Sequence, residues 1–179
     1  NEIVKKNEGP LMVCPTPCHE CVEILKEEES PELMEQIKKL SDEFNGAIKL
    51  PIDFAVEKDG KRVEISIEEL PTEYPIYDIG LKSIEQFIES IKKAHTIFIS
   101  GPCGVFEKKE FLRGTKEILT AMANSDAFSI VGGGHTVAAV EMLGLSDKIS
   151  HISTGGGSLE KFMMGEPLPV VEALKAAKR

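Results

Sequence analysis

The sequence predicts an α/β fold, a parallel sheet with helices on both faces in a Rossmann-like three-layer sandwich, with an additional small β excursion. Three short apolar segments, at residues 96–100, 128–131 and 149–153, have the character of buried strands. Helical segments separate them, and strands that alternate with helices are typical of a parallel sheet covered on both faces. Each apolar segment runs into a glycine turn, and such turns gather at the carboxyl edge of a parallel sheet.

Helices are expected between these strands at residues 108–124 and 136–143, and again after the third glycine turn. Before the first strand, Ser83 and Gln86 match a capping box, and apolar residues follow them at helical spacing. We therefore expect a helix that Ser83 caps.

The segments upstream are less regular. Residues 30–46 match a helix with a serine N-cap, a proline at the first helical position and a terminal glycine. Residues 47–56 are apolar and extended in character, although Pro51 argues against an unbroken central strand there. Residues 62–67 alternate in polarity behind a Lys-Asp-Gly-Lys turn, which predicts the small β excursion.

Length and charge limit the functional classes. A chain of 179 residues with 41% hydrophobic residues is expected to form one domain. Its formal charge of −9 argues against binding to nucleic acid or to an anionic membrane. Because the sequence has no membrane-spanning apolar run and no leader pattern, we expect a cytoplasmic location. The chain begins with Asn rather than Met, which suggests that preceding residues were removed or were not included.

The three glycine turns carry the chemistry. They are Gly-Pro-Cys-Gly at 101–104 and Gly-Gly-Gly at both 132–134 and 155–157. Glycine lets the backbone approach a ligand closely, and the helix that follows each turn offers unpaired N–H groups to an anion. The arrangement favours a polyphosphate ligand. Neither the P-loop motif nor the G-x-G-x-x-G motif of dinucleotide-binding folds is present.

Seven segments of the chain follow the pattern of one family in order and spacing. They are GPCGVFE at 101–107, FLRGT at 111–115, VGGGHT at 131–136, SHISTGGG at 150–157, PLPVVEAL at 167–174, LPID at 50–53 and DIGLKS at 78–83. With them the chain resembles the phosphoglycerate kinases, and so many ordered matches are more specific than any single motif.

The resemblance implies a domain organisation and an activity. In that family this region is most of the C-terminal domain, which binds ATP or ADP, and a separate N-terminal domain binds 3-phosphoglycerate. Residues 46–179 would then be a nucleotide-binding α/β domain, and residues 1–45 a helical or irregular segment of the same domain. The implied reaction is reversible phosphoryl transfer between 1,3-bisphosphoglycerate and ADP in glycolysis. Since the 3-phosphoglycerate domain is absent, we expect these residues alone to be inactive.

The resemblance also implies residue roles. Glu107 would accept hydrogen bonds from the ribose hydroxyls, Val105 would pack against the sugar or base, and Ile76 and Tyr77 would line the adenine pocket. The glycine runs would hold the phosphates, since phosphoryl transfer depends on positioning and charge neutralisation. The implied nucleotide-binding residues are Ile76, Tyr77, Gly101, Pro102, Val105, Glu107, Gly133, Gly134, His135 and Thr136, and the implied catalytic residues are Gly155, Gly156 and Gly157.

Three departures from the family pattern bear on the site. His135 stands where most members have the Asp that binds the nucleotide's Mg²⁺, and imidazole suits that hard ion poorly. We therefore assign no protein metal ligand and expect phosphates and water to hold Mg²⁺. His135 then either lies near a phosphate or bonds only locally. Ser100 replaces the usual Asn, and the family's Gly-Ala-Lys segment is absent.

The cysteines suggest a different class of function. Cys14, Cys18 and Cys21 have the spacing that holds an iron–sulfur cluster in radical enzymes, and with His19 they could also bind zinc. Nothing else in the chain indicates radical chemistry, so reduced, unliganded cysteines are the favoured interpretation. A non-catalytic nucleotide-binding fragment or diverged module is the other alternative to the kinase.

Overall fold

The computed structural model describes residues 35, 38–39, 42–43 and 48–177. They fall into two compact units, one made of the residues up to Ser90 together with Cys103–Ile118, the other of Ile91–Pro102 and the residues from Leu119 onward. Of the helix predicted at 30–46, only five residues are described, and all five are helical. The cluster of Cys14, Cys18 and Cys21 lies outside the described residues.

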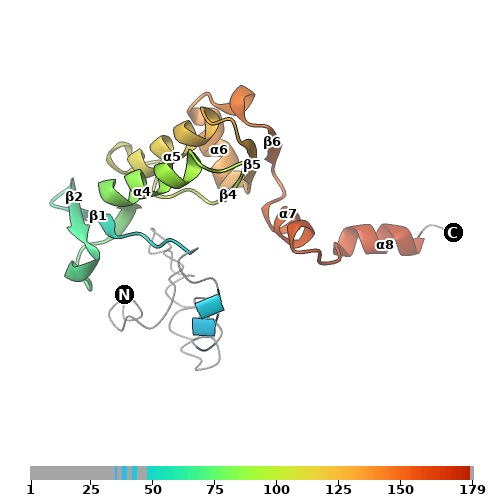
Figure 1. Cartoon of the computed structure of the whole chain (residues 1–179), viewed down its shortest axis with the longest axis horizontal. Helices are drawn as coiled ribbons and strands as arrows, with labels where there is room; N and C mark the ends of the chain where they lie inside the picture. Colours follow the sequence, from blue (N-terminus) through green and yellow to red (C-terminus); the bar gives the residue numbers. More distant parts are fainter. Residues whose placement is uncertain (1–34, 36–37, 40–41, 44–47, 178–179) are drawn as a thin grey trace. The chain divides into compact units, whose positions relative to one another are not determined.

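The first unit contains a three-stranded antiparallel sheet in the order β2-β1-β3, of which Figure 1 labels β1 and β2. Strand β1 (Asp53–Lys58) is central between β2 (Lys61–Ser66) and β3 (Ile76–Ile79). The β1–β2 hairpin turns at Asp59 and Gly60, which both have positive φ, as this kind of two-residue turn requires. The β excursion is confirmed. No strand runs unbroken through Pro51, as expected: β1 begins two residues after it and is the central strand of this sheet.

Helix α4 (Leu81–Ile91) does not begin with the predicted capping box. The Asp53 carboxylate on β1 accepts hydrogen bonds from the backbone N–H groups of Lys82 at 2.9 Å and Ser83 at 2.7 Å. The Ser83 hydroxyl also bonds to Asp53, while Gln86 Nε2 donates to the carbonyl of Leu50. A carboxylate from a neighbouring strand therefore satisfies the helix N-terminus in place of a local side chain.

The second unit contains the predicted parallel sheet, in the order β4-β5-β6. Its strands are β4 (Thr96–Ser100), β5 (Phe128–Gly132) and β6 (His151–Ser153). Helix α5 (Arg113–Ala123) connects β4 to β5, and α6 (Gly134–Met142) connects β5 to β6. The α/β class is confirmed. The helix expected at residues 108–124 begins only at Arg113, after a short 3₁₀ turn at Lys109–Phe111.

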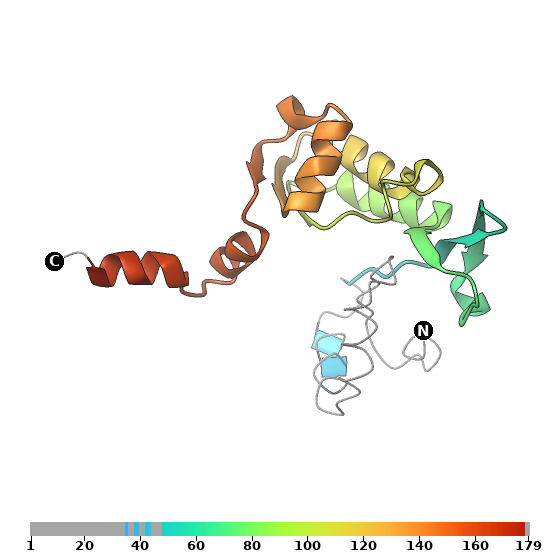
Figure 2. The same ribbon diagram turned by 180° about the vertical axis from the view of Figure 1, so that it is seen from behind.

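Two short helices follow β6. They are α7 (Gly156–Met163) and α8 (Pro169–Ala177), visible as separate helices in Figure 2. Neither buries a side chain among the described residues. The exposed large apolar side chains of this part of the chain are Phe162, Met163, Met164, Val170, Val171 and Leu174.

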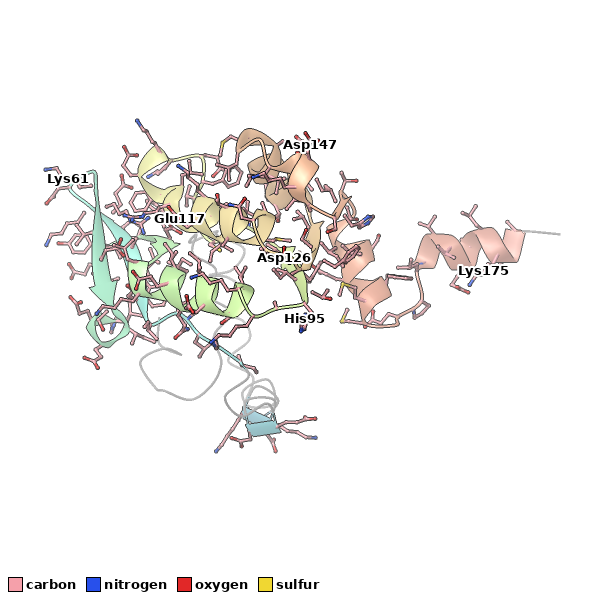
Figure 3. All side chains as sticks on the ribbon, turned by 45° about the horizontal axis from the view of Figure 1, so that its top comes forward. Lys61, His95, Glu117, Asp126, Asp147 and Lys175 are labelled. Carbon is pink, nitrogen blue, oxygen red and sulfur yellow. The ribbon has the colours of Figure 1, made fainter. Side chains whose placement is uncertain are left out.

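Elsewhere in the chain, charged side chains such as Lys61 and Asp147 are exposed and point away from the ribbon, as Figure 3 shows.

A buried carboxylate lies at the centre of the first unit. Asp78 on β3 is fully buried and accepts hydrogen bonds from Arg62 Nη1 at 2.6 Å and from the backbone N–H of Gly114 at 2.8 Å. A Cβ atom at Gly114 would collide with that carboxylate. The first turn of α5 therefore approaches Asp78 as closely as only glycine allows.

Replacing Gly114 with Ala should destabilise the protein by about 2 kcal/mol, because the new methyl group overpacks the Asp78 site. Helix propensity alone would favour Ala by about 1 kcal/mol, so a net loss of stability would come from the contact with Asp78. Gly134→Ala is the matched control at the start of α6, where a Cβ meets no atom within 4 Å. Urea unfolding measures both. An equal effect of the two substitutions would contradict this packing.

Candidate functional site

Residues of all three glycine turns meet in the second unit, as the sequence predicts. The backbone N–H of Gly101 donates to Thr136 Oγ1 at 2.7 Å, which joins the turn after β4 to helix α6. The N–H of Gly133 donates to the carbonyl of Ser153 at 3.2 Å. A Cβ at Gly156 would lie 3.0 Å from Gly133 Cα. We call this group, Gly101, Gly133, Gly134 and residues 155–157, the glycine cradle.

Two helices begin in the glycine cradle with their N-terminal amides uncapped by side chains. Gly133 is the N-cap of α6 with φ +86°, a conformation that favours glycine, and Gly155 is the N-cap of α7. No side chain of the described residues caps either helix. The Thr136 hydroxyl, in the first turn of α6, accepts from the backbone N–H of Gly101. Two adjacent positive helix ends with open N–H groups make an environment suited to an anion.

Polar oxygens line the same cradle. The Ser100 hydroxyl donates to Glu160 Oε1 at 2.6 Å, and a Cβ at Gly133 would lie 3.8 Å from both Ser100 Oγ and Thr136 Oγ1. Sequence reasoning missed Glu160, because its place beside β4 depends on how α7 folds back. Hydroxyl and carboxylate oxygens are the donors that a hard cation prefers.

These oxygens do not amount to a protein-only metal site. In the part of the chain that the structure describes, no three His, Cys, Asp or Glu side chains form a group that could hold a metal ion. His135 is exposed in the first turn of α6, and its imidazole is not a ligand that Mg²⁺ prefers. A divalent cation here would need most of its ligands from a bound anion and water.

The remaining predicted residues belong to the first unit. The backbone N–H of Val105 donates to the carbonyl of Tyr77 at 2.8 Å, so the segment after the first glycine turn is tied to β3 beside Ile76. Ile76, Tyr77 and Val105 are half-buried and Glu107 is exposed. These three residues give a half-buried apolar surface, and the Glu107 carboxylate follows two residues after Val105.

Lys108 covers one face of this surface. Its Nζ lies 4.0 Å from the centroid of the Tyr77 ring and 2.6 Å from Glu57 Oε2. The hydrogen bond from Lys108 to Glu57 raises the pKa of the lysine, so the ammonium group stays charged over the ring. Phe111 meets the Tyr77 ring in a T-shaped contact with centroids 5.2 Å apart. The orientation of Tyr77 is therefore fixed by its neighbours on two sides.

Cys103 is part of the first glycine turn but is not a reactive group. Thr115 Oγ1 accepts hydrogen bonds from the backbone N–H groups of Cys103 and Gly104 at 3.2 and 3.3 Å. Burial raises the pKa of the Cys103 thiol to about 12, and the negative charge of Asp78 contributes to the rise. Because the thiolate is the nucleophile, the native thiol is inert.

Brief treatment with iodoacetamide at pH 8 should therefore leave Cys103 unmodified in the folded protein. In urea the thiol regains its ordinary pKa, and its labelling should accelerate on the order of 100-fold. Peptide mapping by mass spectrometry separates Cys103 from the other three cysteines. Equal labelling rates in the folded and unfolded protein would show that the thiol is not shielded.

The predicted site residues thus form two groups. Gly101, Pro102, the α6 start and residues 155–157 belong to the second unit, whereas Ile76, Tyr77, Val105 and Glu107 belong to the first. Sequence reasoning assigned no role to Arg62 or Asp78, although Asp78 opens the quoted DIGLKS segment. The hydrogen bonds that join them to each other and to the segment at the start of α5 link residues far apart in the sequence, and no local pattern reveals them.

Comparison with known proteins gives one consistent family. The family model for phosphoglycerate kinase matches residues 16–166. The phosphoglycerate kinase of Methanothermus fervidus is 44% identical over 156 residues, which cover 87% of this chain and 38% of that protein. The phosphoglycerate kinase of Pyrococcus abyssi is 42% identical over 158 residues, 86% of this chain and 38% of that protein.

Solved structures agree with these sequence matches. The crystal structure of phosphoglycerate kinase from Pyrococcus horikoshii superposes with a TM-score of 0.73 at 42% identity, over 86% of this chain and 39% of that one. The enzyme from Coxiella burnetii gives a TM-score of 0.72 at 34% identity, over 81% of this chain and 38% of the other. The chain therefore spans well under half the length of these relatives.

Proposed function

The chain belongs to the phosphoglycerate kinase family, and on that premise we propose that it is the nucleotide-binding part of such an enzyme. The complete reaction would move a phosphoryl group reversibly between 1,3-bisphosphoglycerate and ADP, giving 3-phosphoglycerate and ATP. The glycine cradle carries the proposal, because two helix N-termini without side-chain caps converge there. This is the chemistry that an adenine nucleotide's phosphates require.

The cradle divides into two tasks. Gly133, Gly134 and Thr136 approach the phosphates of ADP, and residues 155–157 direct backbone N–H groups at the phosphoryl group in flight. Phosphoryl transfer needs little covalent help from a protein, since most of its catalysis is positioning and stabilisation of charge on the transferring oxygens. Backbone amides provide both without a charged side chain. Gly101 and Pro102 line the same site.

The nucleoside is assigned to the residues around Tyr77. Ile76 and Tyr77 line the adenine pocket, Val105 packs against the sugar or base, and Glu107 accepts from the ribose hydroxyls. A carboxylate can accept two hydrogen bonds from vicinal hydroxyls, and the exposure of Glu107 leaves it free to do so. The hydrogen bond between Val105 and Tyr77 supports this grouping.

Mg²⁺ would accompany the nucleotide, and the oxygen donors of the cradle fit such a hard ion. When bound, the ion would neutralise negative charge on the phosphates. The phosphates and water would supply most of its ligands, with the Glu160 carboxylate and the Ser100 hydroxyl nearby. His135 lies in the first turn of α6, where its imidazole can donate to a phosphate oxygen.

The second substrate belongs to the rest of the enzyme. The chain spans 38% of its relative from Methanothermus fervidus, and 3-phosphoglycerate would bind to the family's N-terminal domain. Domain closure, which excludes water from the reaction, needs both domains. We therefore expect negligible turnover from these residues alone and a cytoplasmic, glycolytic role for the complete enzyme. Substantial kinase activity of the isolated chain would refute that expectation.

A nucleotide-binding module with no catalytic role is the second candidate function. Both functions require ADP binding. Phosphoryl transfer to 3-phosphoglycerate after addition of a separately produced N-terminal domain would favour the kinase.

Calorimetry should detect ADP binding to the wild-type chain in the presence of Mg²⁺. Gly156→Ala should weaken it about tenfold, a loss of about 1.4 kcal/mol, because its Cβ would press on Gly133 and part the two turns. Gly157→Ala is the matched control, since a Cβ there meets no atom within 4 Å. No binding by the wild type would overturn the proposed function, and equal effects of both substitutions would contradict the cradle.

His135→Ala should weaken ADP binding severalfold, because the imidazole would no longer donate a hydrogen bond to a phosphate oxygen. Calorimetry measures the affinity. His95→Ala is the control, because His95 is exposed beside the opposite end of β4. Unchanged affinity of His135→Ala would place His135 away from the phosphates.

A further inference from the structure

Asp78 is a buried ion whose partners all come from the polypeptide around it. It accepts hydrogen bonds from Arg62 Nη1 at 2.6 Å, from the N–H of Gly114 at 2.8 Å and from the N–H of Ile79 at 2.9 Å. Burial raises the pKa of Asp78, whereas the hydrogen bond and charge of Arg62 and the two amides lower it. Removing one partner from such a group is costly, because the charge that remains is buried and unpaired.

The segment that carries Val105 and Glu107 is packed against this carboxylate at both of its ends. A Cβ at Gly104 or at Gly114 would collide with the carboxylate of Asp78, so the backbone contacts it on either side of Glu107. The Asp78 side chain occupies the space that these two glycines leave open. The Asp78 carboxylate thus contacts the segment from Gly104 to Gly114 at both of its ends.

Arg62 fixes the middle of the same segment. Its Nη1 also reaches the carbonyl of Glu110 at 3.3 Å, and its Nη2 donates to the carbonyl of Ile79 at 3.0 Å. The guanidinium lies 5.9 Å from the centroid of the Phe111 ring. One arginine on β2 therefore joins β3 to the segment, with a planar fork of donors that lysine cannot reproduce.

The contacts of Asp78 and Arg62 lie next to the residues assigned to the nucleoside. Tyr77 precedes Asp78 and Val105 follows Gly104, and the two are joined by the 2.8 Å hydrogen bond from Val105 N to Tyr77 O. Glu107 is two residues further and exposed. Its carboxylate position depends on a backbone that Asp78 and Arg62 hold. A shift of about 1 Å in that backbone is enough to weaken a directed hydrogen bond.

We propose that Asp78 and Arg62 are positioning residues for ribose recognition, which hold the segment from Gly104 to Gly114 so that Glu107 meets both vicinal hydroxyls of the nucleotide. The inference rests on the proposed function and adds to it the origin of selectivity for ribonucleotides over 2′-deoxyribonucleotides. Asp78 and Arg62 touch no ligand and act through Glu107.

The test compares the affinities for ADP and 2′-deoxy-ADP by calorimetry on the whole 179-residue chain. The wild type should prefer ADP about tenfold, the value of one charge-assisted hydrogen bond. Glu107→Gln should bring that ratio close to one. Asp78→Asn and Arg62→Lys should do so as well, although neither removes Glu107.

Asp53→Asn is the matched control. Asp53 is equally a buried carboxylate of the first unit, 6% exposed, but it bonds to the amides at the start of α4 and not to the segment with Glu107. This variant should lower the urea midpoint and keep the wild-type nucleotide ratio. Circular dichroism establishes which variants fold, and Arg62→Lys decides the question if Asp78→Asn does not.

The outcomes separate the two proposals. Failure of the wild type to bind ADP overturns the proposed function itself. If the wild type binds ADP and prefers it, but Asp78→Asn and Arg62→Lys keep that preference as Asp53→Asn does, the two residues are only structural and the inference fails. Equal wild-type affinities for the two nucleotides also overturn it, because Glu107 would then make no contact that selects ribose.

Discussion

The close approach of Gly133 and Gly156 is the constraint on which the candidate site depends. Only 3.0 Å separates Gly133 Cα from the position that a Cβ on Gly156 would occupy, so any side chain at that position would force the two turns apart. Because they stay together, the N-termini of α6 and α7 open into the same space. The site is therefore made of backbone, which explains how an acidic chain can offer a place for phosphate.

In the first unit, too, glycines allow a close approach of the backbone, but for a different purpose. Two glycines, Gly104 and Gly114, allow the chain to close around the Asp78 carboxylate, and Arg62 on β2, the other edge strand of the sheet, satisfies that charge. A buried ion pair of this kind adds little net stability, because desolvation offsets most of its attraction. Its contribution is a defined backbone path between Tyr77 and Glu107, which the nucleoside assignment requires.

Local patterns predicted the elements whose causes are local. The apolar runs gave β4 and β5 within one residue, the glycine runs placed the turns at one edge, and the resemblance identified the family that the comparisons confirm. Features that depend on contacts between residues far apart in the sequence were not predicted. Asp53 on β1 replaced the expected Ser83 cap, β3 is only four residues long and contains Asp78, and Glu160 reaches Ser100 only through the fold of α7.

Amide NMR spectra of the chain titrated with ADP and with adenosine test the central claim most directly, since adenosine has the base and ribose but no phosphate. Binding at the glycine cradle predicts that ADP shifts the amide signals of Gly133, Gly134 and residues 155–157, while adenosine shifts only those near Tyr77 and Val105. If ADP binds and leaves the amide signals of the cradle unchanged, the phosphates lie elsewhere and the account of the site is contradicted.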